Sequence, residues 1–151
     1  MTSHHLSTRC EVPRSLVEGF PFFADARNLD QITPSWLDFK VLTPEPIEMA
    51  VGTLIDYRLK VRGVPIRWRS RISAWEPPHR FVDEQVKGPY RHWHHEHLFE
   101  ACAGGTLIRD EVDYAVHGGW FEPLIHKLFV KGDVERIFAH RGKALAAIFG
   151  G

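Results

Sequence analysis

Between residues 38 and 116 the sequence alternates apolar and polar side chains through six consecutive segments, and this alternation constrains the fold most strongly. The segments cover residues 38–42, 53–61, 64–75, 80–86, 92–102 and 106–116. A period of two is typical of half-buried strands, and short connections such as Arg62-Gly63 suit hairpin turns. Consecutive hairpins form an antiparallel sheet, which we expect to be strongly curved.

The segment before these strands predicts one further strand and two short helices. Residues 4–11 read as a strand, and Pro13 suits the first turn of a helix that Pro21 breaks or kinks near its end. Residues 25–32 form the second short helix, which ends at Thr33-Pro34 because the residue before a proline disfavours the helical conformation.

After the strands, apolar side chains recur at helical spacing from Phe121 to Ile148, which predicts one long amphipathic C-terminal helix. Gly132-Asp133 interrupts the pattern, so we expect a kink there. The order of elements therefore predicts the α+β class, with a seven-stranded sheet and one long helix.

Composition excludes several classes of function. A chain of 151 residues with 44% hydrophobic content fits a single domain that spans residues 1–151. Nineteen basic residues balance nineteen acidic ones, so the chain lacks the excess positive charge that nucleic-acid binding normally requires. No leader pattern and no apolar run of about 18 residues is present, which favours a soluble, cytoplasmic protein without an integral membrane segment. Cys10 and Cys102 are too few for a disulfide framework.

The most informative stretch for function is residues 81–100, because its alternation places four polar side chains on the inner face. Asp83 and Gln85 share a face with Phe81, and His95 and His97 share a face with Trp93 and Phe99. Polar groups framed by aromatic rings are costly to desolvate unless they have partners. The sequence therefore predicts either an internal hydrogen-bond network or a site that a ligand completes.

The same alternation assigns the neighbouring strands. Trp68 and Ser70 face inward, while Arg67, Arg69 and Arg71 face outward, where Glu96, Glu111 or Asp113 can pair with them. Asp110 and Tyr114 of the last strand also face inward. The candidate ligand-binding residues are Trp68, Asp83, Gln85, Trp93, His95, His97, Phe99, Asp110 and Tyr114.

Several motifs make the chain resemble the SRPBCC superfamily, which includes START domains, the birch-pollen allergen fold and polyketide cyclases. They are Asn28-Leu29, Thr33-Pro34, Gly52-Thr53, FVDEQ at 81–85, Gly88-Pro89 and Trp93-x-His95-x-His97-x-Phe99. The closer resemblance is to bacterial ligand-binding SRPBCC domain proteins that are often labelled cell-division-inhibitor-like. It implies a helix-grip fold, in which a seven-stranded antiparallel sheet wraps around the C-terminal helix and a ligand cavity lies between them.

The leading hypothesis is a carrier or sensor that binds a small hydrophobic or amphipathic molecule in this cavity. Aromatic side chains would form the walls, and the polar set would fix the orientation of the ligand. The alternative is a structural network, in which Asp83 pairs with His95 or His97 only to hold the strand register. Both can be true together.

A second hypothesis is an enzyme of the cyclase, dehydratase or hydrolase type. His95 or His97 with Asp83 or Asp110 could act as a general base, since a carboxylate orients the imidazole and raises its basicity. The sequence has no nucleophile elbow, phosphate loop or oxyanion signature that would support this chemistry independently.

A metal site is a weaker hypothesis, so we expect no metal and no cofactor. His95-x-His97 on a strand projects two imidazoles to one side, as in cupin barrels. The cupin acidic ligand follows that pair by four or five residues, whereas Glu100 follows by three and faces outward. His92 and His94 are predicted to point to solvent.

Trp36, Trp75 and Trp120 near the element ends could contact a protein partner, although nothing else in the sequence supports one. Trp36-Leu37 and Trp120-Phe121 could instead form a gate over the cavity entrance.

Overall fold

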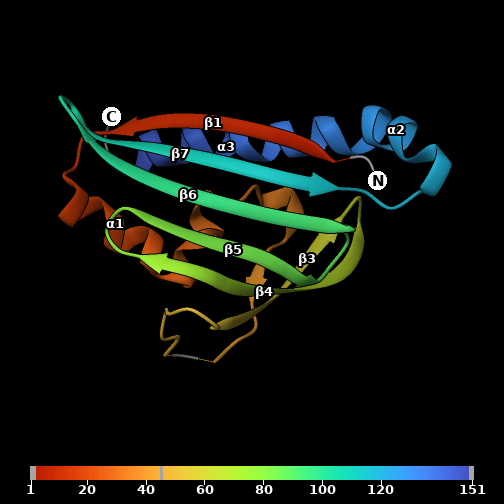
Figure 1. Cartoon of the computed structure of the whole chain (residues 1–151), viewed down its shortest axis with the longest axis horizontal. Coiled ribbons are helices and arrows are strands. Elements are labelled where there is room, and N and C mark those ends of the chain that lie inside the picture. Colours follow the sequence, from red (N-terminus) through yellow and green to blue (C-terminus); the bar gives the residue numbers. More distant parts are fainter. Residues whose placement is uncertain (1–2, 45, 150–151) are drawn as a thin grey trace.

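A computed structural model describes residues 3–44 and 46–149 and shows a seven-stranded antiparallel sheet in the order β1-β7-β6-β5-β4-β3-β2 (Figure 1). Its strands are β1 His4–Val12, β2 Lys40–Val41, β3 Leu54–Val61, β4 Val64–Glu76, β5 Arg80–Lys87, β6 His92–Cys102 and β7 Gly105–Ala115. Each of the seven predicted strands is confirmed, although the predicted strand at residues 38–42 shrinks to the two residues of β2.

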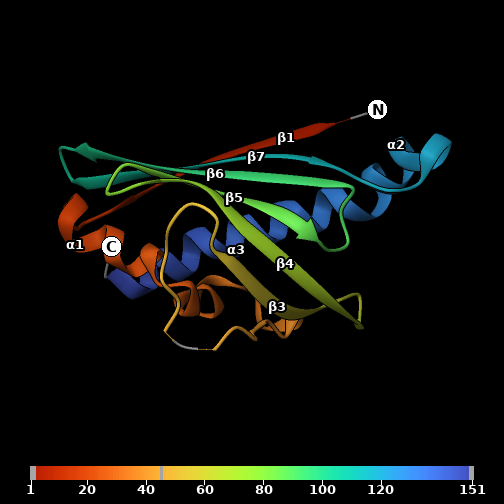
Figure 2. The same cartoon turned by 60° about the horizontal axis from the view of Figure 1, so that its bottom comes forward.

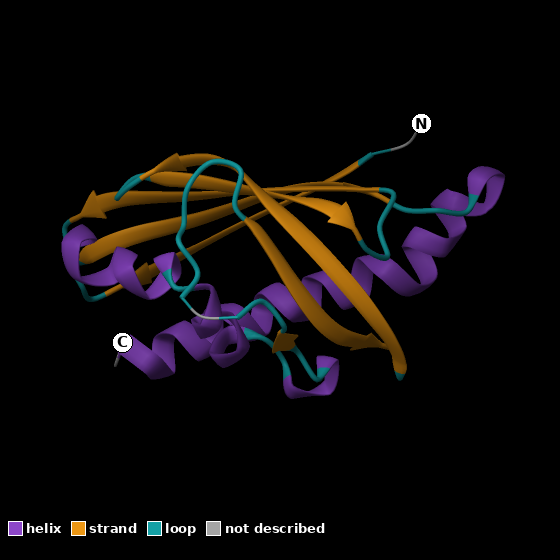
Figure 3. Ribbon diagram, turned by 90° about the horizontal axis from the view of Figure 1, so that it is seen from below, coloured by secondary structure: helices purple, strands orange, loops and turns teal. Residues whose placement is uncertain are grey.

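The sheet is curved, and the helices lie on one of its faces (Figure 3). Two irregularities in the pairing of β4 with β5, at Arg69/Ser70 and at Ile72/Ala74, contribute to the bend because bulges increase the local twist. The β3–β4 turn has Arg62 and Gly63 at φ 50° and 81°, as a two-residue hairpin with matching twist requires.

The first helix, α1 Leu16–Ala24, begins three residues after the predicted start at Pro13. Ser15 is the N-cap, and its hydroxyl both accepts from the Glu18 amide and donates to the Glu18 carboxylate. Pro21 lies inside α1 without ending it, because the carbonyl that it leaves unbonded belongs to the exposed Val17. The second predicted helix is confirmed as the 3-10 helix η1 Ala26–Ile32 and is followed by η2 Ser35–Leu37.

The C-terminal helical run extends from Gly119 to Phe149 and passes beneath the sheet (Figure 2). It consists of η3 Gly119–Phe121, α2 Glu122–Ile125, the π-helical η4 His126–Val130 and α3 Lys131–Phe149. The irregularity is thus the π-helical turn before Gly132 and not a kink at Gly132-Asp133, which lies within α3.

The inward stripe of α3 is formed by Val134, Phe138, Arg141, Leu145 and Phe149. Its apolar members pack against the inner face of the sheet and against Phe20 and Phe23 of α1. The predicted α+β helix-grip architecture is confirmed. In the described part of the chain, no helix combines the length and apolarity that crossing a bilayer requires.

On the outer face, Arg67 and Arg71 are exposed and Arg69 is half-buried, as the alternation predicts. Arg69 donates from Nε to Asp56 Oδ1 on neighbouring β3 at 2.8 Å, rather than pairing with any of the three predicted acids. Glu96 instead accepts from Arg80, which lies diagonally opposite it on β5, and Asp113 and Glu111 lie against His5, directly and diagonally opposite it on β7. Cys10 and Cys102 are free, partly buried thiols.

Candidate functional site

A cavity of about 290 Å³ lies between the inner face of the sheet, the helices η1 and η2, and α3. Its walls are mostly apolar and aromatic, and they include Leu37, Tyr57, Trp68, Trp93, Ile137 and Phe138. Asp83, His95, His97, Ser70 and Arg141 bring polar groups to the same cavity. An apolar enclosure with a few convergent polar groups is the usual form of a small-molecule site.

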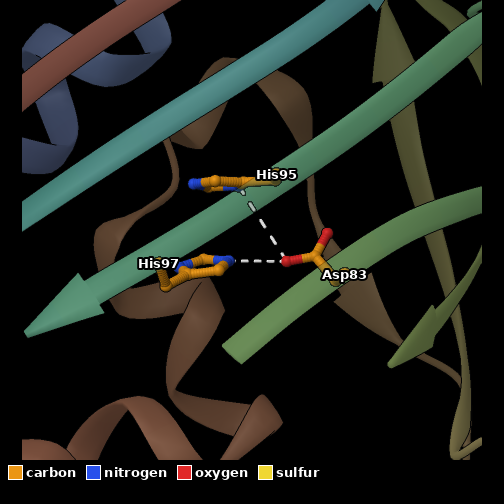
Figure 4. Close-up of side chains that lie close together, drawn as sticks. All are labelled: Asp83, His95 and His97. Atoms are coloured by element: carbon orange, nitrogen blue, oxygen red, sulfur yellow. Dashed lines mark hydrogen bonds and ion pairs between the residues drawn. The ribbon is translucent and has the colours of Figure 1, made fainter. Parts of the chain in front are cut away.

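The polar groups come from adjacent strands through diagonal contacts across the sheet. Asp83 is directly opposite His95 and His97 directly opposite Asp110, but the shortest contacts join the other pairs. His97 Nε2 lies 2.6 Å from Asp83 Oδ2, and His95 Nε2 lies 2.8 Å from Asp110 Oδ1. The two imidazole rings stack on each other (Figure 4), and their centroids are 3.7 Å apart. Two His–Asp pairs are therefore packed into one cluster.

Arg141 of α3 completes this cluster from the opposite layer. Its Nε donates to Asp110 Oδ2 at 3.2 Å and its Nη2 donates to Asp110 Oδ1 at 3.3 Å, so the pair is bidentate. Nη2 also lies 3.5 Å from His97 Nδ1. Asp110 and Arg141 are both buried, and each compensates the charge of the other, which would be very costly to bury alone.

Burial and neighbouring charges set the protonation of the cluster. Burial, with the nearby His95, lowers the pKa of His97 to about 4, so this ring is neutral at neutral pH. Burial raises the pKa of the Asp83 and Asp110 carboxyls, but the contacts with the histidines and Arg141 outweigh it, and both pKa values are lowered. The two carboxylates are therefore anionic.

These protonation states fix the hydrogen-bond directions. Neutral His97 donates its one proton from Nε2 to Asp83 and presents the Nδ1 lone pair to Arg141. His95 donates from Nε2 to Asp110, and its Nδ1 lies 3.9 Å from Asp83 Oδ2. The Trp68 indole donates to Ser70 Oγ at 3.0 Å on the same wall. Most of the donors in the cluster are thus already paired with protein acceptors.

Of the nine predicted ligand-binding residues, the structure places Trp68, Asp83, Trp93, His95 and His97 in the cavity wall. Their contact with a ligand stays a prediction. All nine lie on the inner side of the sheet. The remaining four do not line the described cavity, and they are Gln85, Phe99, Asp110 and Tyr114.

The side chain of Gln85 closes the β5–β6 turn, because it donates to the Tyr90 carbonyl and accepts from the Tyr90 amide. Gly88 makes this possible, since a Cβ there would lie 2.4 Å from Gln85 Oε1. Phe99 packs between Phe20 and Phe23 in the core. Gln85 and Phe99 therefore lie away from the cavity.

Asp110 and Tyr114 are also absent from the described cavity wall. His95 and Arg141 cover the Asp110 carboxylate, so Asp110 holds these two cavity-lining side chains in place and does not itself line the cavity. The Tyr114 hydroxyl lies 2.7 Å from His126 Nε2 in a separate cluster beneath α2. Both residues were predicted as ligand contacts; neither lines the described cavity, and their contact with a ligand stays a prediction.

The charged residue of the cluster that the sequence patterns missed is Arg141. It follows Phe138 by three positions and precedes Leu145 by four, so it occupies the apolar stripe of α3. A guanidinium on such a stripe needs a buried acid opposite. That spacing, together with the inward Asp110, is the signal that could have revealed the pair.

Of the two segments that were predicted to form a gate, one lines the described cavity and the other does not. Trp36 and Leu37 line the cavity, with Trp36 half exposed. Trp120 and Phe121 are exposed and do not line it in the described structure, because α2 lies beyond the end of the sheet (Figure 1). Trp75 packs against Phe20 and Phe81 in the core.

Asp83, His95 and His97 are also the group of described residues whose potential ligand atoms come within 4.8 Å of one another. A bound metal lies in the plane of each imidazole at about 2.0–2.1 Å from nitrogen. The His95 and His97 rings are stacked with an interplanar angle of 24°, so their planes do not meet at that distance. The ring geometry therefore does not fit a metal ion held by both histidines.

Solved structures that resemble this fold share little sequence with it. The Zhui aromatase/cyclase of a Streptomyces species has a TM-score of 0.77 at 16% identity, over 99% of this chain and 94% of that one. A protein of Chromobacterium violaceum has a TM-score of 0.74 at 12% identity, over 97% and 98%. A major latex-like protein of Panax ginseng has a TM-score of 0.68 at 12% identity, over 97% of both chains. These similarities establish the helix-grip fold.

No curated protein sequence is significantly similar to this chain. The narrower label, cell-division-inhibitor-like, therefore stays a prediction. A family match covers residues 12–141, from the end of β1 to Arg141, and so includes every residue of the polar cluster. The chain belongs to the family described as polyketide cyclase / dehydrase and lipid transport.

Proposed function

We propose that this protein binds a small, mostly apolar molecule whose polar end carries a hydrogen-bond donor. The observation that carries the proposal is the cavity of about 290 Å³, with aromatic walls and the Asp83 carboxylate among its polar groups. The family description, which joins polyketide chemistry with lipid transport, is consistent with such a ligand.

The donor preference follows from the pairing within the cluster. His97 donates to Asp83, His95 donates to Asp110, and the Trp68 indole donates to Ser70. Besides the hydroxyls of Tyr57 and Ser70, what the strand residues still offer to a ligand are acceptors, above all the partly accessible Asp83 carboxylate. A ligand hydroxyl or amine would complete this arrangement.

Charge favours the same ligand class. Asp83 and Asp110 are anionic, His97 is neutral, and the guanidinium of Arg141 is already held by Asp110. A ligand carboxylate would add negative charge to a region of low dielectric, where repulsion is poorly screened. We therefore expect neutral or cationic donors to bind better than carboxylates.

The test is a fluorescence titration with the neutral probe N-phenyl-1-naphthylamine, followed by displacement with three matched competitors. These are naphthalene-2-methanol, 2-naphthylmethylamine and 2-naphthoate, which share one ring system and differ in the polar group. We expect saturable probe binding and a preference of about tenfold or more for the alcohol or the amine over the carboxylate. Absence of probe binding would contradict the cavity proposal, whereas preferred binding of 2-naphthoate would contradict only the donor preference.

Asp83→Asn sharpens this test, because the amide oxygen can still accept from His97 but the charge is gone. In this variant we expect the preference over 2-naphthoate to shrink severalfold. Asp56→Asn is the matched control, since Asp56 lies on the outer face and pairs with Arg69. An unchanged preference in Asp83→Asn would show that Asp83 does not select the polar group.

A second candidate function is proton-transfer catalysis in the same cavity, and the observation that favours it is the chain Arg141–Asp110–His95. Asp110 orients His95 through Nε2, which leaves Nδ1 as the lone-pair nitrogen of a ring in the cavity wall. A histidine so oriented by a buried carboxylate is a typical general base.

Turnover of 5-nitrobenzisoxazole tests this candidate. This compound is small and apolar, and its ring opens when a general base removes one carbon-bound proton. We expect turnover above the buffer rate that is lost in His95→Gln, while the naphthylamine probe still binds to that variant. Turnover at the buffer rate in the wild-type protein, or turnover retained in His95→Gln, would remove the catalytic candidate and leave ligand binding untouched.

A further inference from the structure

The helical segment at residues 119–131 turns apolar side chains outward, which is the reverse of the usual arrangement. Trp120 is 98% exposed, and four more large apolar side chains of this segment are between 48% and 69% exposed. This exposed apolar patch consists of Trp120, Phe121, Leu124, Leu128 and Phe129. Contiguous patches of this kind on a folded protein usually mark an interaction surface.

The inner side of the same segment is partly polar. Glu122 accepts from His4 Nε2 of β1 at 2.5 Å, and His126 Nε2 lies 2.7 Å from the Tyr114 hydroxyl of β7. The His4 and His126 rings stack with centroids 3.4 Å apart. These contacts anchor the segment to the edge of the sheet, so they hold the apolar patch in an outward orientation.

The charge of the outward side is positive. Lys127 and Lys131 are exposed, and neither makes an ion pair among the described residues. Within residues 119–131, all of which the structure describes, Glu122 is the one carboxylate, and it is buried against His4. The exposed side of the segment therefore presents aromatic and aliphatic groups together with cations.

The patch is continuous with the wall of the cavity. Val130 follows Phe129 directly and lines the cavity, as does Asp133. Arg62 at the tip of the β3–β4 hairpin donates to the Phe129 carbonyl at 3.1 Å and lies over the Phe129 ring. All three ribbon views place α2 beyond the end of the sheet, where it is free to meet a surface (Figures 1, 2 and 3).

We propose that this patch docks the protein onto an anionic lipid bilayer, with Trp120 and its apolar neighbours inserted and Lys127 and Lys131 at the headgroups. Tryptophan prefers the membrane interface, and apolar residues beside lysines are typical of segments that lie on a bilayer. A second copy of the chain would bring the same lysines together and would gain nothing from their charge. Docking here would place the cavity beside the acyl chains of the bilayer.

Sedimentation with vesicles of phosphatidylcholine containing phosphatidylserine tests the proposal. We expect the wild-type protein to bind these vesicles and to bind pure phosphatidylcholine vesicles about thirtyfold more weakly, since both lysines of the patch are attracted to an anionic surface. Trp120→Ser with Leu128→Ser should reduce binding by about tenfold or more, because two inserted side chains are lost.

Two matched controls change similar residues elsewhere. Val17→Ser removes an exposed apolar side chain from α1, and Lys143→Gln removes an exposed cation from the far end of α3. Both should bind vesicles as the wild-type protein does. Retained binding of the naphthylamine probe by the double serine variant shows that it is folded.

A second measurement reports the position of the patch directly. Brominated phosphatidylcholine in the vesicles should quench part of the tryptophan fluorescence, and Trp120→Phe should abolish most of that quenching while vesicle binding persists. Failure of the wild-type protein to bind any of these vesicles would overturn the proposal. A wild-type dimer that Trp120→Ser dissociates, without vesicle binding, would overturn it in favour of a self-association surface.

Discussion

The described part of the protein contains two largely buried histidine clusters that look alike locally and differ in what surrounds them. The cavity cluster consists of Asp83, His95, His97, Asp110 and Arg141, and the helix cluster consists of His4, Tyr114, Glu122 and His126. Each has a pair of stacked imidazoles and a short contact between a histidine and a carboxylate. None of the four described residues of the helix cluster lines the cavity.

The difference between the two clusters is their charge balance and their access to a ligand. The cavity cluster holds two carboxylates against one guanidinium and opens to an apolar space. The helix cluster joins β1 and β7 to α2 and η4, and it lies outside the cavity wall. Stacked histidines beside a carboxylate are therefore not diagnostic of a site, and what distinguishes the cavity cluster is the volume beside it.

The largest effect is expected from Arg141→Leu, which leaves the Asp110 carboxylate buried without its guanidinium. Removing one partner of a buried ion pair costs about 3–5 kcal/mol, and urea unfolding at neutral pH measures the loss. Arg69→Leu is the matched control, because Arg69 contacts Asp56 through the same two donor atoms on the half-exposed outer face. Equal losses in the two variants would contradict the assigned burial of the Arg141–Asp110 pair.

The next effect is an acid-induced loss of stability that His97 controls. Its pKa is about 4 in the folded protein and about 6.5 in the unfolded chain, so between these values the unfolded chain binds more protons. Stability therefore falls by about 3 kcal/mol as the pH drops from 6.5 to 4. Below that range the lowered pKa values of Asp83 and Asp110 add to the loss.

Urea unfolding of the wild-type protein and of His97→Gln at pH 7, 6, 5 and 4 measures this contribution. Glutamine can donate to Asp83 but does not titrate, so its stability should depend less steeply on pH. His5 and His126 titrate in both proteins, and the difference between the two curves isolates His97. Identical curves would show that His97 is not held neutral by burial.

Much of this architecture could be predicted from the sequence, because alternation within a strand depends only on local order. The inward assignment of Ser70, Asp83, His95, His97 and Asp110 followed from a period of two and is confirmed. The pairing of the histidines with the carboxylates could not be predicted in this way. Whether His97 contacts Asp83 or Asp110 depends on the register between strands and on how far each ring reaches diagonally across the sheet. Register is a property of two strands together, and no single strand encodes it.

The cavity wall could not be predicted for a related reason. Gln85 and Asp83 share a face of β5, yet the tight turn at Gly88 recruits Gln85 and leaves Asp83 for the cavity. The helical periodicity from Phe121 to Ile148 predicted one amphipathic helix, but it did not indicate that the apolar side chains of residues 119–131 point outward. Apolar spacing reports that one side of a helix is apolar and does not report which way that side points.

A smaller effect, of about 1–3 kcal/mol, is expected from Tyr114→Phe in the helix cluster. The change leaves His126 Nε2 buried without the hydroxyl that lies 2.7 Å away. Because Tyr114 does not line the cavity, the affinity for the naphthylamine probe should stay unchanged. A loss of probe binding together with normal stability would reverse the roles that we assign to the two clusters.

The smallest effect separates the clusters most directly, because it applies the same chemical change to both. Glu122→Gln should change the free energy of unfolding by less than about 1 kcal/mol, since an amide oxygen can still accept from His4 and no guanidinium loses its partner. In the described structure Glu122 Oε2 is buried without a hydrogen-bond partner, so the desolvation cost that is removed with its charge offsets the cost of burying the amide N–H groups there. Asp110→Asn in the cavity cluster should cost about 3 kcal/mol or more, because it leaves the charge of Arg141 uncompensated. Equal losses in these two isosteric variants, measured by urea unfolding, would mean that both clusters depend on a balanced buried charge and that the distinction drawn between them fails.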